Sequence, residues 1–117
     1  MQNLNWKENK WARQGDVKIK MIVSLPDGKK VDAKDNNEAI LAYGEVTGHR
    51  HRVFEGQVNF FTIGDSANMF SPKYLEVLSD TATIVHEEHT TIPLVKGLYE
   101  ISIQREYFPD EIRNVMD

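Results

Sequence analysis

The sequence contains no cysteine among its 117 residues, and this absence excludes several kinds of chemistry. Disulfide bonds, zinc–thiolate sites, iron–sulfur clusters and a cysteine nucleophile all need that side chain. Histidine is also scarce, with four residues in the whole chain. Any transition-metal site in this protein must therefore be built from imidazole and carboxylate ligands.

Long hydrophobic runs are lacking as well. Runs such as Met21-Ile22-Val23 and Val53-Phe54 are far shorter than the roughly 20 apolar residues that a membrane-spanning helix needs. The segment from Met1 to Arg13 is polar and carries two tryptophans, which is not the composition of a secretory signal. We therefore expect a cytoplasmic chain with no membrane partner.

Positive charge is outnumbered, because 14 Lys and Arg stand against 18 Asp and Glu, for a net charge of −4. Neutralising phosphates needs a surplus of cations, so the composition disfavours nucleic acid as a partner. Neither a P-loop, nor a dinucleotide fingerprint, nor a nucleophile elbow is found. The length predicts one domain over residues 1–117, with an N-terminal arm over 1–14 and a C-terminal tail over 108–117.

Short apolar stretches separated by turn residues predict an all-β fold. The clearest is Asp16–Leu25, where Val17 and Ile19 alternate with lysines at a period of two. Further strands are expected within 38–46, 51–63, 74–78, 81–86, 92–94 and 98–107, with turns at 55–57, 79–80 and 96–97. About seven or eight such strands predict a small β-barrel or sandwich, followed by a helical turn over 111–116. Edge strands in so small a sheet also predict a homo-oligomer.

All four histidines fall in two short motifs. The first, His49-Arg50-His51, is an H-x-H pair, and residues i and i+2 of a strand point to the same face. The second, His86-Glu87-Glu88-His89, converges only where the backbone turns, because residues i and i+3 of a regular strand face opposite ways. The polar run after His86 favours such a turn. Either both of these imidazoles are ligands, or one lies beside the site.

Imidazoles that converge from two strands predict a site for a divalent transition-metal ion. The candidate ligands are His49, His51, His86 and His89. Zn, Fe, Ni and Mn stay open as the ion, since affinity order alone does not choose among them. Glu87 and Glu88 are candidate catalytic bases toward a metal-bound water, although the sequence leaves open whether the protein is an enzyme.

Two alternative functions stay open. Thr47, Arg50 and Arg52 could present a hydroxyl and two guanidinium groups to a phosphate. The protein would then be a noncatalytic module that binds a nucleotide or another small anion. In the second alternative the histidines lie at an interface of a structural or assembly protein, for instance of a phage.

The motifs carry two resemblances. The segment from Gly44 through His49-Arg50-His51 to Glu55-Gly56 resembles the first histidine motif of the cupins. That resemblance implies a small jelly-roll barrel in which His49, His51 and Glu55 bind the metal. The chain also resembles small bacterial and phage proteins of unassigned activity, in Gln14-Gly15-Asp16-Val17, the GEVTGHRHR stretch, His86–His89 and Arg105-Glu106-Tyr107. This second resemblance implies that the histidine motifs belong to a common core of those proteins.

Overall fold

A computed structural model of the protein describes residues 5–8, 10–43, 49–64 and 71–103, which form an all-β fold. Its strands are β1 (Trp11–Gln14), β2 (Val17–Ile22), β3 (Lys30–Asp32), β4 (Ile40–Tyr43), β5 (Arg50–Glu55), β6 (Val58–Ile63), β7 (Lys73–Val85) and β8 (Ile92–Ile103). In these residues no helix has the length and apolar character that a membrane span requires. The helical turn predicted over 111–116 lies outside the described residues.

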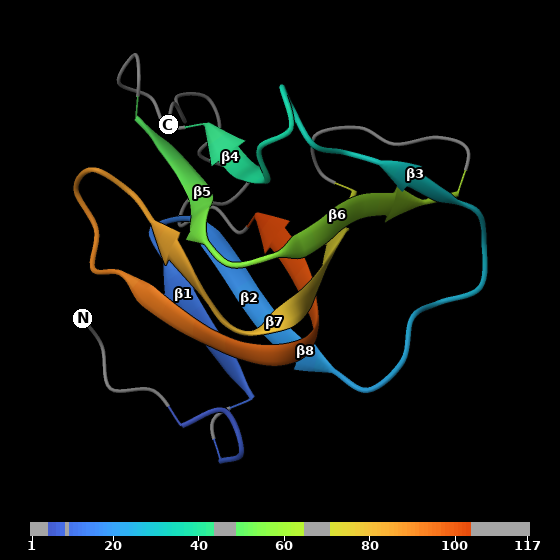
Figure 1. The fold of residues 1–117 in the computed structure, drawn as a ribbon, viewed down its shortest axis with the longest axis horizontal. Helices are drawn as coiled ribbons and strands as arrows, with labels where there is room; N and C mark the ends of the chain where they lie inside the picture. The colour runs from blue at the N-terminus through green and yellow to red at the C-terminus, as the bar shows by residue number, and fades with distance from the viewer. Residues whose placement is uncertain (1–4, 9, 44–48, 65–70, 104–117) are drawn as a thin grey trace, which may run out of the picture.

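The strands form one antiparallel sheet in which β7 and β8 are central (Figure 1). The strand order is β1-β2-β8-β7-β5-β4, while β6 pairs with both β7 and β3. The all-β class predicted from the sequence is confirmed. The sheet does not close into a barrel, and a small sandwich describes it better.

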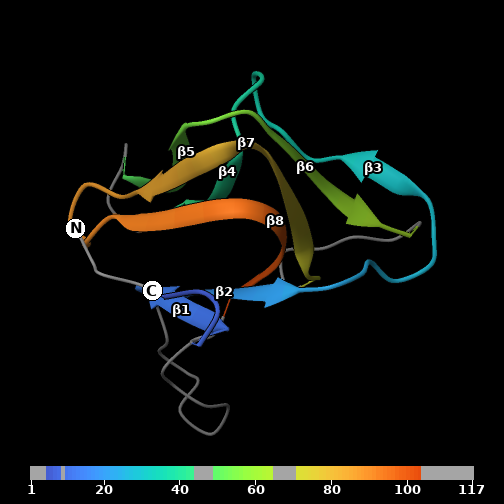
Figure 2. The same ribbon diagram turned by 60° about the horizontal axis from the view of Figure 1, so that its bottom comes forward.

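Bends in β7 and β8 fold this sheet over on itself. The register between the two strands shifts between Val77 and Thr81, close to Gly97 on β8. Figure 2 shows the result, with β4 and β5 above β8 and with β1 and β2 beneath it. Apolar side chains fill the interior, and the largest fully buried ones are Tyr99, Phe60, Ile19, Leu75, Ile84, Ile92 and Leu94.

The structure differs from the sequence-based expectation at three places. Ser79-Asp80 and Lys96-Gly97, which predicted turns, lie inside the continuous strands β7 and β8 at the bend. Turn-forming residues are tolerated there because an irregular register bends a strand without ending it. Residues 11–14, predicted as part of an N-terminal arm, form β1 and pair with β2 from Trp11↔Lys20 to Gln14↔Val17.

The segment before β1 packs onto the core through Trp6. This side chain is 4% exposed, and its ring meets the Tyr99 ring edge-on at a centroid distance of 5.1 Å. Its indole Nε1–H donates to the Pro93 carbonyl at 2.8 Å. The N-terminal segment therefore reaches β8, which lies far along the chain.

Candidate metal centre

The pairing of β5 with β7 brings the two histidine motifs together. Arg52 pairs with Val85, and Val53 pairs with Ile84. One step further along this antiparallel register, His51 comes opposite His86, and opposed side chains lie on the same face of a sheet. Accordingly, the two imidazole rings have centroids 4.3 Å apart.

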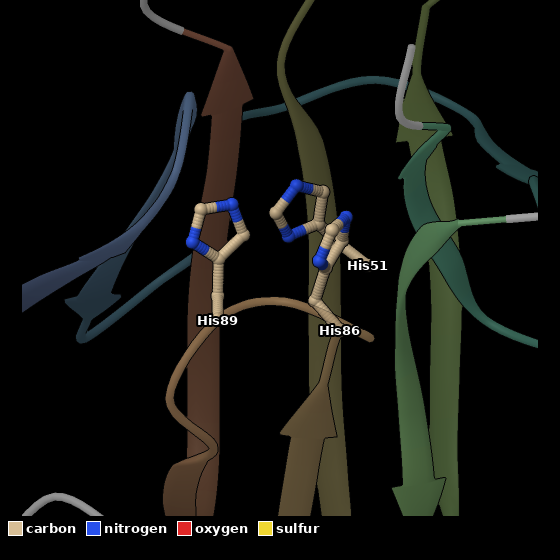
Figure 3. Close-up of side chains that lie close together, drawn as sticks. All are labelled: His51, His86 and His89. Carbon is tan, nitrogen blue, oxygen red and sulfur yellow. The ribbon is translucent and has the colours of Figure 1, made fainter. Parts of the chain in front are cut away.

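A turn after β7 adds the third imidazole. Strand β7 ends at Val85, and residues 86–91 lead to β8. The predicted turn is therefore present, and it returns the His89 ring to 4.6 Å from that of His86 and 5.7 Å from that of His51. Figure 3 shows the three rings gathered at one place. One ligand nitrogen from each of them lies within 4.8 Å of the other two, so these side chains could hold a metal ion.

A second group with metal-ligand spacing shares His86. One ligand atom each from His49, His86 and Glu87 lies within 4.8 Å of the others. The Glu87 carboxylate accepts a hydrogen bond from the Arg50 backbone N–H at 2.9 Å. His49 Nδ1 is shielded from solvent and has no hydrogen bond to the described residues, and Glu88 Oε2 lies 3.6 Å from it. The two members of the H-x-H motif thus fall in different groups.

Gln14 determines how His51 presents its ring. The Gln14 side chain is 2% exposed, and its Nε2 donates to the carbonyl oxygens of Ile84 at 3.3 Å and Thr90 at 2.9 Å. These two bonds fix the orientation of the amide, so that its Oε1, which can only accept, lies 2.8 Å from His51 Nδ1. His51 therefore carries its proton on Nδ1, which leaves the Nε2 lone pair for a metal ion.

Burial keeps the central imidazoles neutral. Burial and the neighbouring His86 and His89 lower the pKa of His51 to about 4, and burial also lowers the pKa of His86. The hydrogen bond from the Arg50 backbone lowers the pKa of Glu87, so its carboxyl stays ionised. Neutral imidazole and ionised carboxylate are the forms that bind metals. At neutral pH, His51, His86 and Glu87 therefore have the charge states in which these side chains bind metals.

The turn between β1 and β2 closes the site from another side. Gly15 has a φ of +61°, and a β-carbon there would lie 2.9 Å from His89 Nε2 and 3.3 Å from His51 Cε1. Glycine suits this position for two reasons: it adopts positive φ without strain, and it leaves room for the His51 and His89 rings. Neither Gln14 nor Gly15 was a predicted site residue. Two signals were available, the resemblance carried by Gln14-Gly15-Asp16-Val17 and the dipeptide Gly15-Asp16, which is typical of a two-residue hairpin turn.

The other predicted site residues lie around the imidazoles or apart from them. Glu55, a ligand implied by the cupin resemblance, is exposed at the end of β5 and joins neither group. The Arg50 guanidinium lies 3.7 Å from the Glu38 carboxylate, and that of Arg52 lies over the Phe54 ring at 5.5 Å. Thr47 lies outside the described residues.

Comparison with known proteins gives a family. No curated protein and no solved structure matches the chain. A family model described as "Domain of unknown function (DUF8820)" matches residues 13–104, a range that holds both histidine motifs together with Gln14 and Gly15. Its description does not mention cupins, so that resemblance stays a prediction. Because the match covers well over half of the chain, the protein belongs to the DUF8820 family.

Proposed function

We propose that the protein binds one divalent transition-metal ion through His51, His86 and His89. The observation that carries this proposal is the convergence of three imidazoles from segments about 35 residues apart. Imidazole nitrogen suits Zn, Fe and Ni, whereas Mn prefers oxygen ligands, so the all-imidazole set favours the first three ions. Three protein ligands also leave a coordination position open, which is typical of catalytic zinc sites.

The group formed by His49, His86 and Glu87 is the alternative position for the ion. A set of two histidines and one carboxylate is typical of non-haem iron. Two observations favour the three-histidine set instead. His51 is 5% exposed and already oriented by Gln14, whereas no member of the alternative group is buried. Because both groups use His86, an ion in one group competes with an ion in the other.

Metal binding requires His86 to give up one hydrogen bond. Its Nδ1 accepts a hydrogen bond from the Glu88 backbone N–H at 3.0 Å, so the neutral ring carries its proton on Nε2. Coordination through either nitrogen then gives up this hydrogen bond, at a cost of about 1 kcal/mol. We expect the turn from His86 to His89 to change conformation when the ion enters.

Equilibrium dialysis of tag-free protein against Zn²⁺ tests the proposal. After removal of metal with a chelator, the wild type should take up about one equivalent of zinc. His51→Ala should weaken zinc binding by more than the roughly 10–100-fold that loss of an outer-shell partner costs. His49→Ala is the matched control from the same motif, and it should leave zinc affinity nearly unchanged.

Three results would decide against the three-histidine set. Uptake by the wild type of less than about a tenth of an equivalent of Zn, Fe or Ni rejects the metal centre altogether. Loss of zinc in His49→Ala with retention in His51→Ala assigns the ion to the alternative group. Equal retention in both variants rejects both groups, since each variant removes one ligand from one of them.

A further inference from the structure

A small pocket adjoins the candidate metal centre. It has a volume of about 270 Å³ and is lined by Arg52, Phe54, Val85, His86 and Glu87. Arg52 and Val85 are direct partners across β5 and β7. Because successive side chains of a strand alternate, Arg52 points to the face of the sheet opposite to that of His51. The pocket therefore opens on the other face, and His86 belongs to both the pocket and the metal centre.

Arg52 is the positive group of this pocket. Its guanidinium lies over the Phe54 ring at 5.5 Å, and no carboxylate of the described residues pairs with it. The neighbouring Arg50 differs, because it lies 3.7 Å from the Glu38 carboxylate. A planar guanidinium offers paired N–H donors that match the two oxygens of a carboxylate. Arg52 is thus placed to receive an anionic group from a ligand.

The remaining walls suit a ligand with a short apolar body. Phe54 and Val85 are apolar, and the volume lies just below the roughly 300–1,000 Å³ of ligand pockets, which suits a small ligand. Among the described residues of the lining Glu87 is the one acidic group, and its carboxylate is already bound by the Arg50 backbone N–H. A divalent ion on His86 would add two positive charges nearby, which outweigh the single charge of Glu87.

We infer that this pocket binds a small organic carboxylate beside the metal centre, with which the pocket shares His86. The carboxylate lies on Arg52, and the apolar part of the ligand lies against Phe54 and Val85. This inference rests on the proposed function for its metal, while the pocket and its arginine are observed independently. Arg52 and Phe54 also line a larger groove of about 580 Å³ with Lys34 and Leu78, which gives the competing position for an anion.

Benzoate is a suitable probe, and its neutral analogue benzamide is the control ligand. Titration calorimetry should show that zinc-loaded wild type binds benzoate about tenfold more tightly than the metal-free chain does. Arg52→Gln should raise the benzoate Kd by about tenfold or more in the zinc-loaded protein, with zinc content unchanged. Benzamide should bind about tenfold more weakly than benzoate. In NMR spectra, the methyl signals of Val85 should shift on addition of benzoate.

Lys96→Gln is the matched control, because it removes one positive charge from an exposed position of β8. It should leave the benzoate Kd unchanged. The inference is overturned if zinc-loaded wild type does not bind benzoate, or if Arg52→Gln binds it as tightly as the wild type. Signal changes confined to Leu78 and Val58 would also overturn it, since those residues line only the larger groove.

The zinc content of each sample is measured separately and shows whether the metal centre forms. If the wild type holds no zinc, the proposed function fails. The comparison of wild type with Arg52→Gln is then made on the metal-free chain. If the benzoate Kd of the metal-free Arg52→Gln variant equals that of the metal-free wild type, the carboxylate pocket is rejected. If the Kd is raised in the variant, the pocket is retained as a binding site without a metal.

Discussion

A single buried amide organises the candidate site at the scale of residues. The Gln14 Nε2 donates to two backbone carbonyls, and this orients the amide so that its oxygen accepts from His51. A ligating histidine is usually held in this way by an acceptor on its other nitrogen. In the proposed metal centre Gln14 is therefore a positioning residue, which would act on the ion only through His51.

Gln14→Met tests this role, because methionine has a similar length and cannot hold the His51 proton. We expect zinc affinity to fall about 10–100-fold, in line with other outer-shell substitutions. The readout specific to positioning is the ¹⁵N NMR spectrum of His51 in the metal-free protein, which should change from one tautomer to a mixture. Gln57→Met, at an exposed position between β5 and β6, is the control. A drop in zinc affinity with an unchanged His51 tautomer would contradict the positioning role.

The sequence predicted the histidines of the site but not the residues that hold them. The motif spacing was informative because the period of a strand and the turn after His86 are local properties. The division of His49 and His51 between two groups depends on the strand register, which no local pattern contains. Gln14 was missed because a glutamine has no chemistry that marks it in a sequence, and its partners Ile84 and Thr90 are remote in the chain.

At the scale of elements, the strands with regular alternation were the predictable ones. Strand β2 was expected within Asp16–Leu25 because one of its faces is buried and the other is polar. Strand β1 was missed because it is a short edge strand with few apolar residues. Its turn nevertheless reaches the candidate metal centre. A strand that contributes little to the apolar pattern thus supplies Gln14 to the site, and the turn after it supplies Gly15.

Gly15→Ala tests the contribution of this turn, and Gly64→Ala is its matched control. Both glycines have positive φ, but a β-carbon at Gly64 meets no atom of the described residues within 4 Å, whereas one at Gly15 meets His89 and His51. We expect each variant to lose about 1–3 kcal/mol of stability from backbone strain. Only Gly15→Ala should also lose zinc affinity, by about tenfold or more, because His89 must move. Urea denaturation and zinc dialysis measure the two effects. Equal zinc affinity in the two variants would show that the turn does not shape the site.

At the scale of the whole molecule, strand β8 joins the parts of the fold. It pairs with β2 and β7, and its side chain Tyr99 is fully buried beneath Trp6. The Tyr99 hydroxyl donates to the Val95 carbonyl at 2.6 Å and accepts from the Val95 N–H at 3.0 Å. These bonds span Lys96-Gly97, where β8 bends. Tyr99 therefore links the bend that folds the sheet to the packing of the N-terminal segment.

This arrangement predicts a loss of stability in alkaline solution. Burial raises the pKa of Tyr99 from 10.0 to about 12, although its hydrogen bond to Val95 acts in the opposite direction. The folded state thus keeps a proton that the unfolded state loses above pH 10. The stabilisation is complete below pH 10 and is lost as the pH rises through 12, with a total of about 3 kcal/mol.

Comparison with Tyr99→Phe isolates this effect, because the other titrating groups are common to both proteins. Phenylalanine leaves the Val95 backbone groups without the hydroxyl, so the variant should be about 1–3 kcal/mol less stable at pH 7. As the pH rises from 10 to 12, ionisation of Tyr99 is favoured in the unfolded wild type alone, and the stability difference should shrink. Urea unfolding at a series of pH values measures both free energies. A difference that stays constant up to pH 12 would mean that the hydroxyl is no better protected in the fold than in the unfolded chain, contrary to the complete burial of Tyr99.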